Sequence, residues 1–308
     1  MRWRRHLGAL GLTGLLMAGV SGSALVEGAT PSRFVFTQTT ANGFASYVYT
    51  ASDIGRNKRK VSSRRAVGRP SVAPEGSRLV FAGPRGDDSD GRYSLWVVGI
   101  NGGALRRITS PLYGDFDPAW SPDGRWIAFT RSTRGNLSSP CCMLGKVSTD
   151  GRRTTRIINH TTGGSWPSWS PDSRNLAFAG RGGVWTIRAD GAGARLLVRG
   201  AVTQPAWSPN GHRIAVVQQT SASRSRIVTV RSTGGGAQVV ADPGGLVETP
   251  VWSPDGTALY FTRYRGLGDD GRTSADVYRA AGGKLTRMIR YATPLYGIDH
   301  WGPRPAGG

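Results

Sequence analysis

Histidine, the side chain that most often serves in acid–base catalysis and zinc binding, is rare in this chain of 308 residues. After the N-terminal His6 there are three, His160, His212 and His300, and none stands at the spacing of a zinc motif. The sequence also lacks a Gly-x-Ser-x-Gly elbow, a phosphate-binding loop and a His-Glu-x-x-His motif. These observations predict a protein that is not an enzyme and that holds no metal ion and no cofactor.

Carboxylates are clustered in two short segments, 86–91 and 268–271. Such clusters can bind calcium, but the spacing in neither segment matches an EF-hand loop. The two segments occupy equivalent places in the repeats described below, each before the third strand of its unit. We therefore interpret both as hydrated turns.

The two cysteines of the chain are adjacent, Cys141 and Cys142. The simpler interpretation is a pair of ordinary thiols on a surface loop. The alternative is a vicinal disulfide, which would be strained because consecutive Cα atoms are about 3.8 Å apart, closer than in most disulfides. Such a bond would stiffen the loop that precedes it, and the sequence leaves both interpretations open.

A motif of the form Pro-x-Trp-Ser-Pro-Asp-Gly occurs five times, complete or nearly so. Its copies recur at intervals of about 40 to 50 residues, which are typical of blade-like repeat units, and begin at Pro70, Pro118, Pro167, Pro205 and Pro250. Ser-Pro-Asp-Gly fits a β-turn, and the apolar run after each copy fits a buried strand. We expect the repeated residues to pack between neighbouring units or to shape the turns: Trp120, Asp123, Trp169, Asp172, Trp207, Trp252, Asp255 and Trp301.

Two further strand-like segments and a Gly-rich turn complete each repeat, which gives four strands per unit. The sequence therefore predicts an all-β fold, a six-bladed β-propeller of four-stranded antiparallel blades. Segment 32–37 is similar to segment 77–82, one repeat later, and Trp301 lies one repeat after Trp252. We expect the N- and C-terminal strands to share the sixth blade and so to close a single domain over residues 25–308.

The repeated Pro-x-Trp-Ser-Pro-Asp-Gly, followed by Ile-Ala-Phe in segment 127–129, resembles the propeller domain of the TolB family. The resemblance covers nearly all of the chain after residue 30. It implies an extracytoplasmic propeller that binds other molecules. Related propellers include metal-dependent lyases that use several histidines on one face, and the two expected on one face here, His160 and His300, are too few for such a site.

The N-terminus has the pattern of a secretory signal peptide. Basic residues in segment 2–6 precede an apolar stretch, 7–20, and the small residues Gly22-Ser-Ala24 follow. The stretch is shorter than the roughly 20 residues of a transmembrane helix, so we expect residues 1–24 to be removed, leaving a periplasmic or secreted protein with no membrane span. The adjacent Arg4 and Arg5 leave both general secretion and twin-arginine export open.

The formal net charge of the chain is +21, almost all of it from arginine. Because arginine is evenly spread, we interpret most of this charge as solvated surface. The alternative is attraction to anionic envelope polymers, for which the densest cluster lies in segment 56–65. Nucleic acid is not an expected partner outside the cytoplasm, and no nucleic-acid module is present.

The loops that enter each blade should surround one mouth of the central channel. Their tyrosines and tryptophan are of the types that dominate binding hot spots, although Asp117 and Asp299 would equally suit hydrogen bonds to turn amides. The candidate rim residues are Tyr113, Asp115, Asp117, His160, Trp166, Tyr296, Asp299 and His300. We predict a monomeric, TolB-like scaffold that binds a protein or peptide of the cell envelope. The alternatives are a carbohydrate-binding, polymer-binding or lyase-type propeller, and a stand-alone sensory module of a membrane partner.

Overall fold

A computed structural model describes residues 33–39, 46–52, 57–84, 86, 93–110, 114–132, 142–157, 163–267, 273–290 and 295–301. These residues form β-strands and turns and contain no helix. No described segment is therefore a helix that could cross a membrane. The predicted signal peptide lies outside the described residues.

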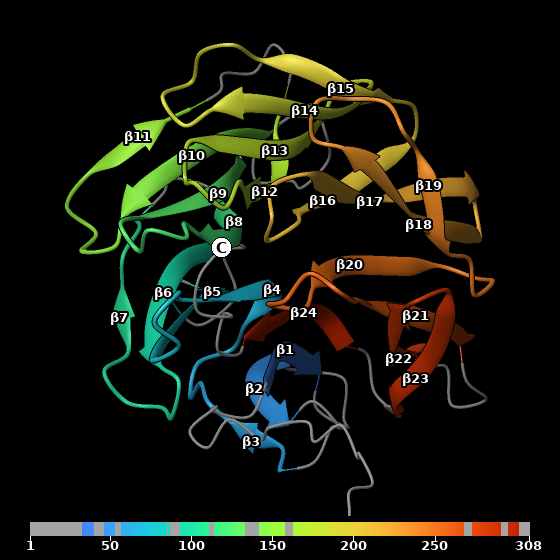
Figure 1. The fold of residues 1–308 in the computed structure, drawn as a ribbon. Helices are drawn as coiled ribbons and strands as arrows, with labels where there is room; N and C mark the ends of the chain where they lie inside the picture. The colour runs from blue at the N-terminus through green and yellow to red at the C-terminus, as the bar shows by residue number, and fades with distance from the viewer. Residues whose placement is uncertain are drawn as a thin grey trace, which may run out of the picture.

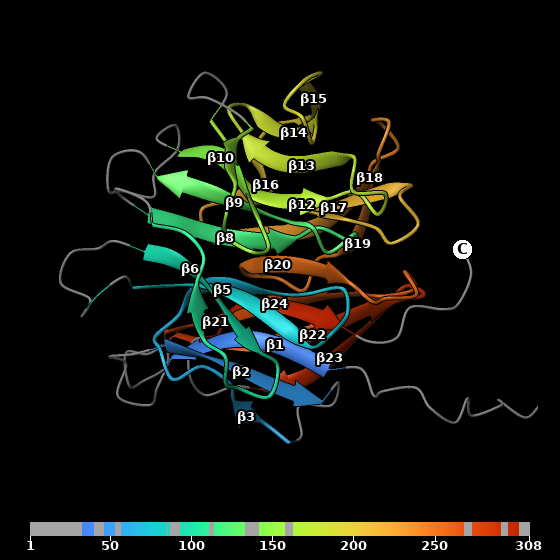
Figure 2. The ribbon, with the colours of Figure 1, turned by 90° about the vertical axis from the view of Figure 1, so that its left-hand side faces the viewer.

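The first sheet combines both ends of the described chain. Its strand order is β24-β1-β2-β3, with the bounds β24 (Leu295–Trp301), β1 (Arg33–Thr39), β2 (Ser46–Ser52) and β3 (Arg59–Lys60). The β1–β24 pairing is antiparallel and runs from Arg33 opposite Trp301 to Gln38 opposite Leu295. The two terminal segments that the sequence predicts to be neighbours are thus adjacent strands, as both views show (Figures 1 and 2).

The next sheet has eight strands and divides into two groups of four. The first group is β4 (Val67–Val72), β5 (Arg78–Pro84), β6 (Tyr93–Gly99) and β7 (Arg106–Arg107). The second is β8 (Gly114–Trp120), β9 (Trp126–Ser132), β10 (Cys142–Ser148) and β11 (Thr154–Arg156). A single parallel residue pair, Tyr93 with Gly114, connects the groups, whereas every other strand pair among the described residues is antiparallel.

Three separate four-stranded sheets follow in chain order. They are β12 (Ser165–Trp169), β13 (Asn175–Gly180), β14 (Gly183–Arg188) and β15 (Arg195–Arg199); β16 (Val202–Trp207), β17 (Arg213–Ser221), β18 (Arg224–Arg231) and β19 (Gln238–Ala241); and β20 (Val247–Trp252), β21 (Leu259–Leu267), β22 (Thr273–Ala281) and β23 (Lys284–Arg290). The sheets are arranged radially around a common axis (Figure 1), with β4, β8, β12, β16, β20 and β24 nearest to it. We call these the inner strands.

The hydrophobic core lies between neighbouring sheets. Phe81, fully buried in β5, packs with Val35 of β1 and Val48 of β2. In the same way Phe261 of β21 packs with Val217 of β17. The second strand of each unit is buried on both faces, which is why the apolar run after each Ser-Pro-Asp-Gly turn is continuous rather than alternating.

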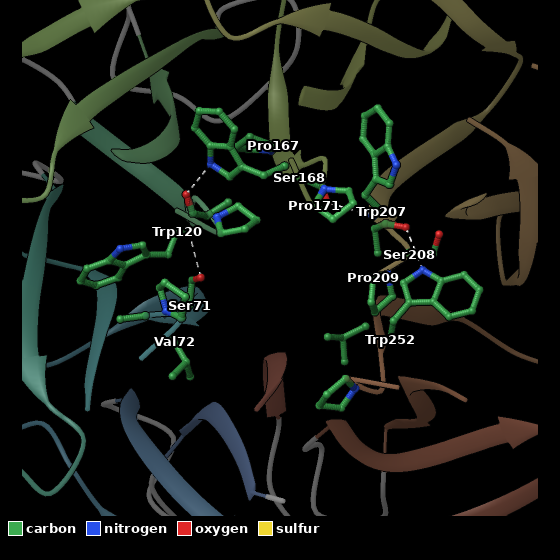
Figure 3. A pocket seen from close by; sticks show the side chains of 18 of the residues that line it. Ser71, Val72, Trp120, Pro167, Ser168, Pro171, Trp207, Ser208, Pro209 and Trp252 are labelled. Atoms are coloured by element: carbon green, nitrogen blue, oxygen red, sulfur yellow. Dashed lines mark hydrogen bonds between the residues drawn. The ribbon is translucent and has the colours of Figure 1, made fainter. Parts of the chain in front are cut away.

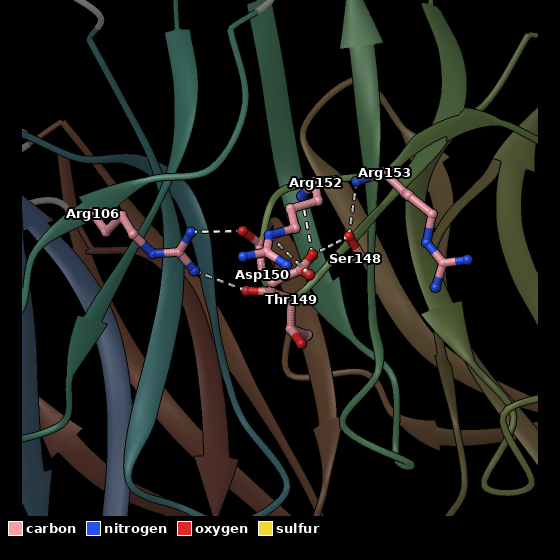
Figure 4. A network of polar contacts seen from close by, with 6 residues as sticks. All are labelled: Arg106, Ser148, Thr149, Asp150, Arg152 and Arg153. Carbon is pink, nitrogen blue, oxygen red and sulfur yellow. Dashed lines mark hydrogen bonds and ion pairs between the residues drawn. The ribbon is translucent and has the colours of Figure 1, made fainter.

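Several arginines of the outermost strands bind a turn of the following group of four strands. Arg106 of β7 donates from Nη1 to the carbonyl of Asp150 (2.8 Å) and from Nη2 to that of Thr149 (3.0 Å), as Figure 4 shows. Arg195 of β15 binds the carbonyl of Thr233 (3.0 Å), and Arg59 of β3 binds that of Asn101 (2.6 Å), by the same arrangement. Part of the arginine excess therefore joins neighbouring groups of four strands, a use that the composition alone did not reveal.

Candidate functional site

Two cavities lie at opposite ends of the inner strands. The first, of about 550 Å³, is at their C-terminal ends. Figure 3 shows the motif tryptophans and turn prolines around it, and its lining includes Trp120, Pro122, Trp169, Pro171, Trp207, Pro209, Trp252 and Pro254. The tryptophans also belong to the packing between sheets, because Trp169 lies in one cluster with Ala119 of β8 and Leu176 of β13.

In each repeat, one residue stands directly before the motif tryptophan (or before Val72, which takes its place). The type of this residue correlates with the hydrogen bonds made by the tryptophan of the following repeat. Where that residue is serine, its hydroxyl accepts the backbone N–H of the next tryptophan: Ser71 from Trp120 (3.1 Å) and Ser168 from Trp207 (2.9 Å). The indole N–H of each of these tryptophans then donates to a glycine carbonyl in its own turn.

Where the residue is alanine, the pattern changes. The carbonyl of Ala119 accepts the indole N–H of Trp169 (2.9 Å), and the carbonyl of Ala206 accepts that of Trp252 (3.0 Å). Both arrangements satisfy the indole N–H, as buried tryptophan requires. The turn residues Asp123, Asp172 and Asp255 each accept the hydroxyl of the motif serine and a backbone N–H two positions on.

The second cavity, of about 280 Å³, lies at the N-terminal ends of β4, β8 and β12. Most of its lining is apolar or aromatic, with one carboxylate; the lining residues are Val67, Gly68, Tyr93, Phe116, Asp117, Thr130, Cys142, Gly164, Ser165 and Trp166. A cavity of this character, with few polar groups among many apolar ones, is typical of a binding site.

An unusual backbone feature positions its central residues. Asp117 and Trp166 have left-handed φ angles of 48° and 51°, and the equivalent Gln204 and Thr249 have 50° and 53°. Non-glycine residues seldom adopt this conformation, which costs roughly 1–2 kcal/mol. Each lies directly before the lead proline of its repeat, where the pairing register of the inner strand shifts. The repeat itself therefore imposes the bulge, and the residue type at this position is free to vary.

The Asp117 carboxylate is held against the wall of the second cavity. Its Oδ2 accepts a hydrogen bond from the Thr130 hydroxyl (3.4 Å). Its Oδ1 faces Gly68, which has a left-handed φ of 67° and where a Cβ would lie only 3.3 Å from that oxygen. Any side chain at position 68 would therefore crowd the carboxylate.

Burial raises the pKa of Asp117 to about 6. The positive charge of Arg69 and the Thr130 hydrogen bond oppose this rise, and the negative charge of Glu248 adds to it. Arg69 itself donates to the carbonyl of Pro167 (3.3 Å). Burial also raises the pKa of Glu248, against the hydrogen bond that it accepts from the Tyr264 hydroxyl (3.2 Å). Arg69 of β4, Asp117 of β8 and Glu248 of β20 thus form one electrostatically coupled group on three inner strands.

We expect Asp117→Asn to raise the free energy of unfolding at pH 7 and to flatten its dependence on pH. The unfolded carboxyl loses its proton near pH 4, whereas the folded one keeps it until about pH 6. The contribution of this group is therefore fully present below pH 4 and is lost as the pH rises through 6, an effect of about 3 kcal/mol. Urea unfolding between pH 4.5 and 7.5 measures it, with Asp190→Asn as the control for removing one exposed carboxylate. Parallel curves for wild type and Asp117→Asn would contradict the raised pKa.

The structure brings together two of the predicted rim residues, Asp117 and Trp166, in the second cavity. Asp115, two positions earlier, is 0% exposed, and its carboxylate accepts Nε and Nη2 of Arg131 at 2.6 and 2.8 Å. A partner could not reach it without breaking this ion pair. Binding roles for all of these residues stay predictions.

The other predicted site residues are only partly described. Tyr113 and His160 lie outside the described residues. Tyr296, Asp299 and His300 are placed by their backbone in β24, and their side chains lie outside the described part. Trp301 is the last residue of the same strand.

The cysteine pair and the acidic segments are likewise only partly described. Cys142 is buried and lines the second cavity, while Cys141 lies outside the described residues, so both interpretations of the pair stay open. The acidic segments 86–91 and 268–271 also lie outside, apart from Gly86. Where side chains are described, no group of three or more histidine, cysteine or acidic residues is placed to hold a metal ion.

Sequence reasoning missed the residues that complete the second cavity, above all Gly68, Tyr93 and Thr130. Tyr93 and Thr130 come from β6 and β9, outside the repeated motif. The sequence did contain one signal for the position of the cavity. The position before the lead proline varies from repeat to repeat (Arg69, Asp117, Trp166, Gln204, Thr249) while the motif around it is constant.

A family model described as the TolB beta propeller domain matches residues 146–285. The solved structure of TolB from Acinetobacter baumannii superimposes with a TM-score of 0.72 at 18% identity, covering 87% of this chain and 66% of that one. The chain carries a TolB-type β-propeller. A chain of the nidogen/laminin complex shares the fold, with a TM-score of 0.65 at 16% identity over 87% of this chain and 98% of that one.

The curated relatives of this TolB-type propeller are longer proteins. An uncharacterized protein of Agrobacterium fabrum is 26% identical over 204 residues, which are 62% of this chain and 53% of the relative. The uncharacterized peptidase YuxL of Bacillus subtilis is 31% identical over 80 residues, 25% of this chain and 12% of the relative. The chain thus spans about half the length of the first and about an eighth of the second.

The matches correct the prediction that the protein is not an enzyme. Besides YuxL, the TolB-type propeller is similar in fold to the tricorn protease (TM-score 0.57, 11% identity, 86% of this chain and 30% of that one). It is also similar to puromycin hydrolase (TM-score 0.56, 18% identity, 80% of this chain and 42% of that one). Propellers of this type therefore occur in peptidases and hydrolases, and the lack of short catalytic motifs was too narrow a test.

Proposed function

We propose that this protein is an exported propeller that binds a protein or peptide of the cell envelope at the second cavity. The four-stranded groups β4–β7 and β8–β11 count as separate blades in this proposal, and the β24-β1-β2-β3 sheet closes a ring of six. Residues 1–24 would be removed on export, and the mature monomer would act in the periplasm or outside the cell.

One observation carries the proposal: Asp117 and Trp166 meet in one cavity although they come from neighbouring units. Each has a left-handed φ angle at the bulge of an inner strand, a conformation that the repeat imposes and that holds the residue at the cavity. A preorganised aromatic side chain loses little entropy when a partner binds, and tryptophan is prominent among interface hot spots. An extended peptide entering along the axis would meet both residues together.

We expect Trp166→Ala to lower the capture of the envelope partner at least tenfold, which corresponds to about 1.4 kcal/mol, a typical hot-spot loss. The mature protein is used to capture crosslinked partners from envelope extracts, and the captured protein is quantified for each variant. Trp185→Ala is the matched control, because Trp185 lies on β14 with its indole N–H bound to the carbonyl of Arg181 (3.0 Å). If both variants capture as much as wild type, the second cavity is not where the partner binds.

A further inference from the structure

Cations cover many of the aromatic rings in this protein. Lysine or arginine groups lie over the rings of Tyr47, Tyr49, Trp96, Trp120, Trp126 and Phe129, at 3.1 to 5.3 Å from the ring centres. Each of these contacts is a cation–π interaction supplied by the chain itself. Some other aromatic rings carry no such cation among the described residues, and where several of them surround open volume, the cluster can accept a cation from outside.

The second cavity contains such a cluster. Tyr93 and Phe116 pack at 5.1 Å between ring centres with their planes tilted by 50°, and Trp166 completes the aromatic lining. No lysine or arginine of the described residues lies over any of these three rings. The rings instead surround open volume.

The carboxylate in this cavity also lacks a charged partner at close range. The two aspartates that are fully buried, Asp115 and Asp276, are paired with Arg131 (2.6 Å) and Arg265 (3.1 Å). For Asp117, the described residues offer the Thr130 hydroxyl at 3.4 Å and no lysine or arginine nitrogen within 4.0 Å. Arg69 acts on it only at longer range, and the guanidinium of Arg69 is directed to the carbonyl of Pro167.

We infer that the second cavity is a subsite for an alkylammonium group, such as the side chain of a lysine on the bound partner. Three aromatic rings and one carboxylate form the environment that binds such a cation. The volume of 280 Å³ is at the small end of ligand cavities, so it suits one side chain better than a larger ligand. Gly68, which has no side chain, lies beside Oδ1 of Asp117 in the cavity lining. This subsite would be part of the partner-binding site proposed above, and so it rests on that proposed function.

The overall positive charge does not oppose this binding strongly. The arginines of the outer strands are exposed, and at physiological salt their fields fall off over about 8 Å. The charged groups that act on the carboxylate are Arg69 from β4 and Glu248 from β20, with opposite signs. Their contributions offset each other in part, so the local charge at neutral pH is set by Asp117.

The test uses n-butylammonium as the probe and n-butanol as its uncharged counterpart, with the full mature protein and saturation-transfer NMR. We expect saturable binding of n-butylammonium, at least tenfold weaker binding of n-butanol, and tighter binding at pH 7 than at pH 5. Asp117→Asn should remove the preference for the cation, whereas the control Asp190→Asn should keep it. Equal binding of the two probes, or equal effects of the two variants, would overturn the inference.

Two further arms separate the source of the cation from the proposed function. A Gly-Lys-Gly peptide with blocked ends should bind more tightly than n-butylammonium if the group belongs to a protein partner, and no more tightly if it belongs to a small amine. Selective amine binding together with unchanged partner capture by Trp166→Ala would retain the subsite and reject the proposed function. Loss of capture without any amine preference would retain the proposed function and reject the subsite.

Discussion

Deletion of residues 294–308, which removes β24, is expected to leave the protein without a cooperative unfolding transition. β24 supplies the antiparallel partner of β1 from Arg33 to Gln38. The side chains of residues 34–38 in β1 are buried, and Phe34 packs against Tyr260 of β21 with 5.0 Å between ring centres. Loss of the strand exposes this edge and its core, a cost comparable to the 5–15 kcal/mol by which whole domains are stable. Circular dichroism during thermal unfolding measures the result.

Deletion of residues 302–308 alone is the control, because it retains all of β24. This shorter deletion should unfold at the wild-type temperature. If the longer deletion also unfolds with the wild-type midpoint, the β1–β24 pairing does not support the fold, and the ring closure proposed above fails with it.

The second large effect is expected for Asp115→Ala, which should lower the free energy of unfolding by about 3 kcal/mol. The substitution leaves Arg131, whose side chain is 29% exposed, without the carboxylate that it binds at 2.6 Å. Breaking a buried pair by removing one partner costs about 3–5 kcal/mol, and the partial exposure of Arg131 favours the lower end. Urea unfolding at pH 7 measures the change.

The same experiment has an internal control and a rescue. Asp190→Ala removes an aspartate from an exposed ion pair with Arg188 and should leave stability unchanged within error. The double variant Asp115→Ala/Arg131→Met should recover a large part of the loss, because an apolar side chain no longer needs a charged partner. A loss for Asp115→Ala no larger than that for Asp190→Ala would show that this pair does not stabilise the protein.

The strands could be predicted because their signals are local. The Ser-Pro-Asp-Gly turn and the apolar run after it are set by residues within a few positions of each other. The constant motif also identified the tryptophans that line the first cavity, such as Trp169. Even the β1–β24 pairing was accessible, since segment 32–37 repeats segment 77–82.

The second cavity could be predicted only in part. Asp117 and Trp166 were among the candidates because they lie in the segments expected to enter the blades, but Asp115 was chosen by the same reasoning and is enclosed in an ion pair. The two aspartates are two positions apart on β8, and a regular strand would give them the same face. The register shift between Phe116 and Ala119 intervenes, and Asp117 has a left-handed φ of 48°.

The sequence by itself determined the repeat, the strands and the turns between them, because these depend on interactions between residues close together in the chain. Only the tertiary structure decided which units meet and what lies between them. The Thr130 hydroxyl reaches Asp117 from the adjacent strand, Arg106 binds a turn of the next four-stranded group, and the indole of Trp169 donates to the carbonyl of Ala119 in the preceding unit. The physical reason is that these contacts join residues up to about one repeat apart, and the radial packing of rigid sheets brings them together.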